Sequence, residues 1–188
     1  MPTIAILSSS VRNGRASHRV ALFFQDYIRE NSLGDIDLID LRSLNFPVFE
    51  ERLKFLKEPP EDVLSFADRI RSADAIIIVT PEYNGGYPAS LKNVVDLLYN
   101  EWYRKPIGIA TVSGGAFAGT QVITSLVFTL WKMKAWVVPS MFPVPKVEET
   151  FDEQGKPADL KVISKRAATF LQDILWCVKA KQAMMDNK

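Results

Sequence analysis

The chain has 188 residues, of which 47% are hydrophobic and 24% are charged, and both fractions are typical of a globular protein. This length predicts a single domain that spans residues 1–188. With 23 Lys and Arg against 22 Asp and Glu, the net charge of +1 gives no strong overall field, so neither nucleic acid nor an anionic membrane surface is expected as a partner.

The cysteine content and the first residues indicate the cellular compartment of the protein. Cys177 is the only cysteine, which excludes an internal disulfide and a cysteine-based metal cluster within one chain. The residues after Met1 form a short apolar run that ends at Ser8, without the basic start of a signal peptide. The apolar runs are far shorter than the ~20 residues that span a bilayer. We therefore expect a cytoplasmic protein without a membrane segment.

In the first half of the chain, short apolar or alternating runs predict strands, and longer runs with apolar residues three or four apart predict helices. The order is a strand at 3–7, a helix at 17–29 with Ser17 as N-cap, a strand at 35–41, an irregular connection at 45–60, a helix at 61–72 and a strand at 73–80. Asp35 to Leu41 alternates polar and apolar residues, as a strand near a sheet edge does. Ala73 to Thr80 is the most hydrophobic β-branched run, which is typical of a central strand covered on both faces.

The second half continues the alternation. It predicts a helix at 89–99, a strand at 106–112, a helix at 119–131, a strand at 135–138, a long loop at 139–157 and a closing helix at 158–183 whose inner face includes Leu160. Alternating strands and helices indicate a three-layer α/β fold with a parallel sheet, although alternation alone does not decide the strand order. Ligands in such sheets bind beyond the carboxyl ends of the strands, so the loops after the first, third and fourth strands are the candidate sites.

The loop after the first strand, residues 8–17, is rich in groups that bind phosphate. The hydroxyls of Ser10 and Ser17, the guanidinium groups of Arg12 and Arg15, and the free amides at the start of the next helix could all donate to one phosphate group. The loop matches neither G-x-G-x-x-G nor G-x-x-x-x-G-K-[ST], which excludes a Rossmann fingerprint and a Walker A loop. The alternative is a polar loop whose arginines face water.

The other two loops are rich in turn residues. The segment Pro81-Glu82-Tyr83-Asn84-Gly85 follows the most buried strand, and its Asn-Gly pair can adopt positive φ, which lets backbone amides approach a planar ring. The loop after the fourth strand, Ser113-Gly114-Gly115, would bring further amides to the same edge. The alternatives are a rigid turn that covers the core and glycines required by helix–strand packing.

Three motifs together resemble a known family. These are S-S-x-R-x-G-R-x-S at 9–17, P-E-Y-N-G-G-Y-P-A-S-L-K-N-x-x-D at 81–96 and S-G-G at 113–115. This order resembles the NADPH-dependent FMN reductase family, which includes flavin, quinone, azo dye and chromate reductases, over residues 3 to about 140. Ser9 differs from the glycine that many members have. The resemblance implies a flavodoxin-like three-layer sandwich with a five-stranded parallel sheet in the order 2-1-3-4-5.

The resemblance also implies site residues and partners. Ser10, Arg12 and Ser17 would bind the phosphate of FMN, with Arg15 nearby; Pro81, Glu82, Tyr83, Asn84 and Gly85 would line the ribityl chain and the ring, and Ser113, Gly114 and Gly115 would close the far side. NADPH or NADH would be the co-substrate, with a small-molecule electron acceptor. A homo-oligomer, dimer or tetramer, is implied, in which the helix at 91–99 meets its mate.

The chemistry would belong to the cofactor. Cys177 has no second cysteine to pair with, and no other side chain can accept and release two electrons, so we assign neither a catalytic side chain nor a metal. Turnover would follow a ping-pong mechanism through FMN. We expect Cys177 to be a buried small residue, His18 to be exposed in the first turn of its helix, and the four tryptophans to lie in the core or at a subunit interface. The alternatives are a flavodoxin-type electron carrier, which the neutral composition and the two loop arginines disfavour, and an FMN-binding regulatory protein without turnover.

Overall fold

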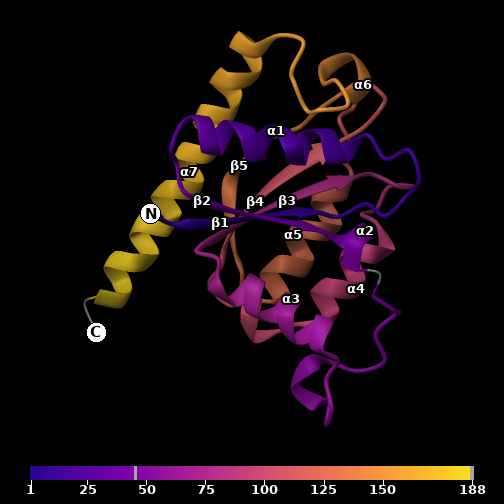
Figure 1. Cartoon of the computed structure of the whole chain (residues 1–188), viewed down its shortest axis with the longest axis vertical. Coiled ribbons are helices and arrows are strands. Elements are labelled where there is room, and N and C mark those ends of the chain that lie inside the picture. The colour runs from indigo at the N-terminus through magenta and orange to yellow at the C-terminus, as the bar shows by residue number, and fades with distance from the viewer. Residues whose placement is uncertain (45, 187–188) are drawn as a thin grey trace.

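The structure is a computed structural model that describes residues 1–44 and 46–186. Five parallel strands form one sheet in the order β2-β1-β3-β4-β5 (Figure 1). The strands are β1 (Thr3–Ser8), β2 (Asp35–Asp40), β3 (Ala75–Pro81), β4 (Pro106–Val112) and β5 (Trp136–Met141). The strand order implied by the family resemblance is confirmed.

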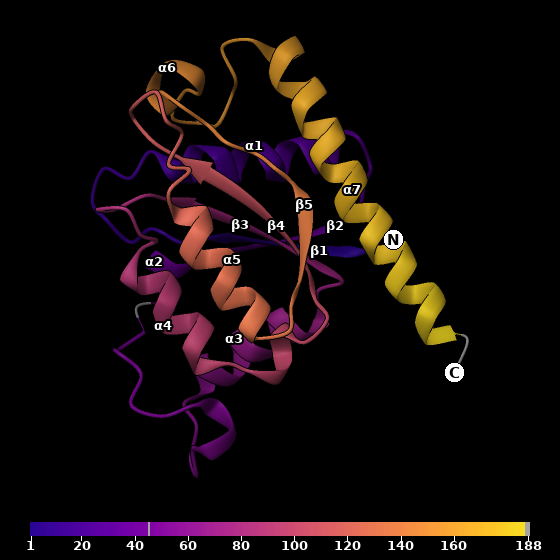
Figure 2. The same cartoon turned by 180° about the vertical axis from the view of Figure 1, so that it is seen from behind.

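Helices cover both faces of this sheet. They are α1 (Ser17–Glu30), α2 (Leu41–Leu44), α3 (Glu61–Ser72), α4 (Ala89–Leu97), α5 (Val122–Lys132), α6 (Val147–Thr150) and α7 (Leu160–Asp186), with 3-10 turns at Leu53–Phe55 and Asn100–Trp102. Figures 1 and 2 show α1 and α7 on one face and α3, α4 and α5 on the other. The predicted three-layer α/β fold is therefore confirmed.

The core consists of two apolar layers, one on each side of the sheet. Successive residues of a strand point to opposite faces, so Ile4 packs with Phe24 and Phe170 in the layer under α1 and α7, while Ala5 packs with Phe66 in the layer under α3, α4 and α5. Because helices cover both layers, a central strand is buried on both faces. β3 fits this position, since its residues from Ala75 to Thr80 are all buried and all but Thr80 are apolar.

The edge strand β5 is longer than predicted. It continues through Pro139 to Met141, whereas the predicted strand ended at Val138 and the predicted loop began at Pro139. Ile107 pairs with Val137 and Ile109 with Met141, so β5 bulges between these two pairs. A proline is tolerated there because an edge strand with a bulge does not need every backbone amide for pairing.

Two helices begin later than the periodicity suggested. Ala118 and Gly119 have φ values of 56° and 69°, in the left-handed region, so α5 starts only at Val122. The carboxylate of Asp159 accepts the backbone N–H of Val162 at 3.0 Å and thereby caps α7 at Leu160. The expected inner-face position of Leu160 is wrong, since its side chain is 63% exposed.

Two expected loops contain short helical segments. The loop predicted at 139–157 includes the end of β5 and the single turn α6. The predicted connection at 45–60 is irregular from Phe46 onward apart from the turn Leu53–Phe55, and Asn45 lies outside the described residues. In the ranges 1–44 and 46–186, no helix is both long enough and apolar enough to cross a membrane.

Candidate functional site

The loops after β1, β3 and β4 leave the sheet at the same edge because the strands are parallel. Ser8 is level with Val79, and Pro81 with Val112. Ser10 Oγ and Tyr83 Oη are hydrogen-bonded at 2.7 Å and join the first two loops. The structure therefore places the predicted residues of the first and second loops in contact.

The loop after β1, which we call the phosphate loop (residues 8–17), has a buried start and an exposed middle. Ser8, Ser9 and Ser10 are fully buried, and the Ser9 carbonyl accepts a hydrogen bond from Ser90 Oγ at 2.6 Å. Arg12 is exposed, and its guanidinium makes no hydrogen bond or ion pair to any residue in the described part of the chain. That guanidinium is thus free to contact an anion.

Three buried hydroxyls at this edge have no hydrogen-bond partner within the described residues, namely those of Ser9, Ser17 and Thr111. Ser17 was predicted to cap α1 but is instead its first helical residue; Ala16 occupies the N-cap position without a side-chain hydrogen bond. A buried hydroxyl without a partner is costly, and a ligand that accepts hydrogen bonds would remove that cost. The phosphate loop supplies two of these hydroxyls.

Arg15 is engaged differently from Arg12. Its guanidinium makes a two-pronged salt bridge to the carboxylate of Asp40, at the end of β2, and also donates to the backbone carbonyl of Ser10. Burial alone would raise the pKa of Asp40, but the hydrogen bonds from Arg15 and from the Arg42 backbone outweigh it and hold that pKa below its ordinary value. Asp40 is therefore a carboxylate, paired with Arg15 beneath the loop.

His18 lies in the first turn of α1 and is half-buried, not exposed as expected. Its Nδ1 is hydrogen-bonded to Ser8 Oγ at 2.9 Å. Burial lowers the pKa of His18 and the charge of Arg15 lowers it further, against an opposing effect from Asp40. The lowered pKa favours the neutral form of the imidazole beside the phosphate loop.

The turn after β3 is closed by backbone hydrogen bonds in both directions between Tyr83 and Gly86, at 2.8 and 3.1 Å. Asn84 and Gly85 have φ values of 53° and 79°, which is the positive-φ pair that the sequence predicts for a tight turn. The carboxylate of Glu82 accepts the backbone N–H of Gln121 at 3.3 Å and ties this turn to the start of α5. The turn is accordingly fixed at both ends.

The S-G-G segment after β4 is held by the chain that follows β5. The backbone N–H of Ser113 donates to Val144 at 3.0 Å, and that of Lys146 donates to the Gly115 carbonyl at 3.0 Å. A methyl group built on Gly114 or Gly115 would meet no atom within 4 Å. The backbone here borders open space, as a site for a planar ligand requires.

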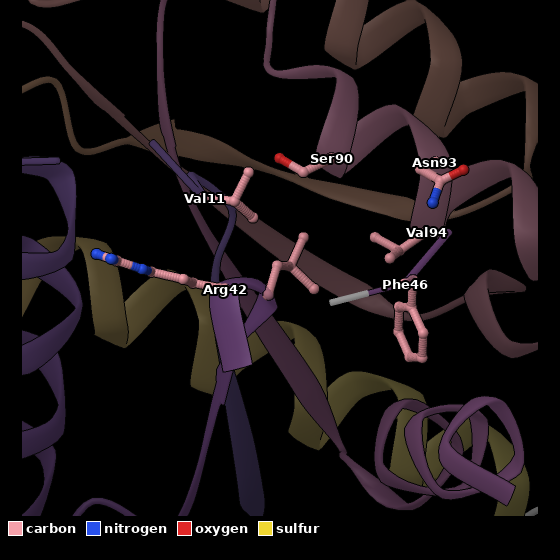
Figure 3. Close-up of a pocket in the computed structure, with 7 residues that line it drawn as sticks. Val11, Arg42, Phe46, Ser90, Asn93 and Val94 are labelled. Atoms are coloured by element: carbon pink, nitrogen blue, oxygen red, sulfur yellow. The ribbon is translucent and has the colours of Figure 1, made fainter. Parts of the chain in front are cut away.

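A separate cavity of about 370 Å³ lies on the α4 side of the phosphate loop. In Figure 3 Val11, Val94 and Phe46 line it, and the Arg42 guanidinium is directed away from the other labelled side chains. That guanidinium donates to Asn13 at 3.0 Å. Polar and apolar groups thus line this cavity in about equal measure, and its one charged side chain, Arg42, already has Asn13 as a partner.

The sequence reasoning missed the residues that support the loops. Asp40 at the end of β2 and Arg42 in α2 hold the phosphate loop, and Val144 and Lys146 hold the S-G-G segment. One signal was available for Asp40, since an acidic residue that ends a strand beside β1 lies at the ligand-binding edge once the strand order is assumed. The contacts of Val144 and Lys146 leave no such signal.

Comparison with known proteins identifies relatives along most of the chain. The chain is 32% identical over 149 residues to an NAD(P)H-dependent FMN reductase of Saccharomyces cerevisiae. The aligned region covers 72% of this chain and 76% of that protein. It is 30% identical over 166 residues to a quinone reductase of Pseudomonas putida, covering 84% and 85% of the two chains.

A solved structure and a family model agree with these relatives. A flavoenzyme NAD(P)H:(acceptor) oxidoreductase from Paracoccus denitrificans superposes with a TM-score of 0.76 at 23% identity, covering 95% of this chain and 98% of that one, which supports the same fold. The model of the NADPH-dependent FMN reductase family matches residues 2–149. The resemblance noted from the three motifs is thereby confirmed, and the chain belongs to the NADPH-dependent FMN reductase family.

Proposed function

We propose that this protein is an FMN-dependent oxidoreductase that uses NADPH or NADH to reduce a small acceptor such as a flavin, a quinone, an azo compound or a metal oxyanion. The observation that carries the proposal is that the phosphate loop holds two buried hydroxyls, of Ser9 and Ser17, and one exposed guanidinium, of Arg12, none of which has a partner among the described residues. This loop lies at the sheet edge where family members are expected to hold their cofactor. Family membership supports the cofactor and the reaction type.

The phosphate of FMN would lie against the phosphate loop and the start of α1. The hydroxyls of Ser10 and Ser17 and the guanidinium of Arg12 would donate to its oxygens, with Arg15 beneath them, and the positive end of the α1 dipole favours an anion at this place. These groups suit a phosphate monoester, because it offers several acceptors and a double negative charge.

The ring and the ribityl chain would lie between the turns after β3 and β4. Pro81, Glu82, Tyr83, Asn84 and Gly85 would contact one side, and Ser113, Gly114 and Gly115 would close the far side. The open space beside Gly114 and Gly115, and also beside Gly85, supports this placement. The hydrogen bond between Tyr83 and Ser10 would keep the ring and phosphate subsites at a fixed separation.

The protein's part in turnover would be binding and orientation. When held by these loops, FMN would supply the redox chemistry between the nicotinamide and the acceptor, and the two substrates would bind in turn. The turns after β3 and β4 would hold the ring while leaving one face open to both substrates. Hydride transfer needs no acid or base from the protein, so we assign no catalytic side chain.

We also propose that the protein assembles as a homo-oligomer. The outer face of α4, which was expected to meet its mate, carries the exposed ion pair of Lys92 and Asp96. The neighbouring helix α5 instead exposes Phe128 and Trp131, at 61% and 64%, with ring centroids 5.8 Å apart. An aromatic pair facing solvent on one chain supports a contact between chains there.

The first test is the absorbance of the purified protein. We expect yellow flavin bands, or binding of added FMN, followed by bleaching with NADPH or NADH and recovery with a quinone or free flavin. A long-lived neutral semiquinone without direct bleaching would instead indicate an electron carrier, and bound flavin without oxidation of either nicotinamide would indicate a regulatory protein. A protein that binds no flavin would contradict the proposal.

A further inference from the structure

The phosphate loop is held in shape by residues at the end of β2 and just after it, and this support distinguishes its two arginines. Arg15 donates to both carboxylate oxygens of Asp40 and to the Ser10 carbonyl, so one guanidinium connects the end of β2 to the beginning of the loop. The side chains of Arg15 and Asp40 are only 9% and 20% exposed. A guanidinium with these three acceptors and little exposure has few N–H groups left for a ligand.

A second contact from the same place reaches the middle of the loop. The Arg42 guanidinium donates to Asn13 Oδ1 at 3.0 Å, and the backbone N–H of Arg42 donates to Asp40 Oδ1, also at 3.0 Å. Ser10 and Arg15, which flank the loop's exposed stretch, are thus anchored to Asp40, and Asn13 within that stretch is anchored to Arg42. Between these anchors Arg12 is exposed and its guanidinium makes no hydrogen bond to the residues that the structure describes.

We infer that Asp40 and Arg15 are positioning residues that shape the phosphate loop for its ligand, and that Arg12 supplies the guanidinium that contacts the phosphate. The inference rests on the proposed function, and it gives different roles to two arginines that the sequence motif alone does not distinguish. Arg15 orients the Ser10 backbone, and Ser10 in turn presents its hydroxyl both to the phosphate and to Tyr83.

Substitution of Asp40 by asparagine tests this role, because charge and positioning predict opposite changes in FMN affinity. Asp40→Asn removes a negative charge close to the proposed phosphate, so a purely electrostatic view predicts tighter FMN binding. The positioning role predicts the opposite, because the amide breaks the two-pronged pair and releases Arg15 from the Ser10 carbonyl. Riboflavin has the same ring but no phosphate, so its affinity separates an effect on the phosphate loop from an effect on the whole site.

The same strand offers a matched control. Asp37 of β2 forms an equivalent two-pronged pair with Arg69 of α3, which also donates to the backbone carbonyl of Leu38 at 3.0 Å. The side chains of Arg69 and Asp37 are 33% and 28% exposed, and the phosphate loop is not among their hydrogen-bond partners in the described residues. Asp37→Asn therefore makes the same chemical change at a pair that does not touch the loop.

The experiment is a titration of flavin-free protein with FMN and with riboflavin, followed by flavin fluorescence, for the wild type, Asp40→Asn and Asp37→Asn. We expect the Kd for FMN to rise about tenfold in Asp40→Asn, which is a large effect for a residue that does not touch the ligand. We expect the Kd for riboflavin to stay unchanged in that variant, and both Kd values to stay unchanged in Asp37→Asn. Arg15→Lys should weaken FMN binding in the same way, since a lysine keeps the charge but cannot make the two-pronged pair.

Several results would overturn the inference. Unchanged or tighter FMN binding in Asp40→Asn would assign Arg15 to the phosphate itself, as would full retention of FMN affinity in Arg15→Lys. Equal losses for FMN and riboflavin would indicate general damage to the fold. A wild type that binds riboflavin as tightly as FMN would refute the proposed phosphate site, and a wild type that binds neither would refute the proposed function along with the inference.

Discussion

Arg12→Ala is the most direct test of the proposed contact with the phosphate. Arg12 is exposed and its guanidinium has no hydrogen-bond partner in the described residues, so its removal costs the folded chain no interaction of its own. We therefore expect the free energy of unfolding of the flavin-free protein to change by no more than about 0.5 kcal/mol, as for an ordinary surface position. Any loss of FMN affinity then reports on the ligand and not on the fold.

The size of that loss follows from the exposure of the side chain. A hydrogen bond to a charged group contributes about 1.5–3 kcal/mol. Water and salt screen an exposed guanidinium, so we expect the contribution of Arg12 to lie near the lower end of this range, at about 1.5 kcal/mol. Its loss corresponds to about a tenfold rise in the Kd for FMN. The Kd for riboflavin should stay the same, and the loss should shrink as the ionic strength rises.

Titration of flavin-free protein by flavin fluorescence measures these constants, and Arg52→Ala is the control. Arg52 is also exposed, and its guanidinium lies 5.3 Å from the ring centroid of Tyr99, beyond the far end of α4 from the phosphate loop. Its substitution changes the net charge equally. An unchanged Kd for FMN in Arg12→Ala, or an equal rise in Arg52→Ala, would refute the assigned contact.

Three further predictions concern stability, measured as the midpoint of thermal unfolding. A methyl group on Gly108 of β4 would lie 2.6 Å from a ring carbon of Phe170, so Gly108→Ala should lower the free energy of unfolding by about 1–3 kcal/mol, and an unchanged midpoint would contradict this packing. The pKa of His18 is lowered in the folded chain, so below the ordinary value of 6.5 the unfolded chain binds a proton more readily than the folded chain does. The unfolding midpoint should therefore decrease as the pH falls through this range, and the decrease should be smaller in His18→Gln. Burial, aided by the charge of Lys181, lowers the pKa of Lys105 to about 8, so between pH 8 and 10.5 the unfolded chain keeps a proton that the folded chain releases. Stability should therefore rise across that range relative to Lys105→Met, and parallel profiles would contradict the lowered pKa.

Local patterns were sufficient to predict most of the fold. The apolar run of β3 and the alternation of β2 identified a central and an edge strand, since each pattern depends only on which faces of the strand are covered. Helix boundaries were less well predicted, because they depend on single residues. The left-handed backbone at Ala118 and the cap at Asp159 each moved a helix start, and neither leaves a trace in the periodicity.

The candidate site was predictable only where its residues are close in sequence. The turn from Tyr83 to Gly86 follows from its own Asn-Gly pair. The partner of Arg15 lies 25 residues away, on a strand that becomes its neighbour only through the sheet order, so the motif could not separate Arg15 from Arg12. The exposure of His18 was predicted from its helical position alone, whereas the side chain is half-buried and hydrogen-bonded to Ser8 at the end of β1.

The bulge at Pro139 also has a consequence for association. An exposed sheet edge is a template to which another chain can add a strand, and an irregular, proline-containing strand is a poor template. At the opposite edge, β2 begins with the exposed Asp35, whose charge opposes an added strand of the same sequence. Copies of this chain are therefore discouraged from joining their sheets into one, which leaves helix surfaces as the places where subunits can meet.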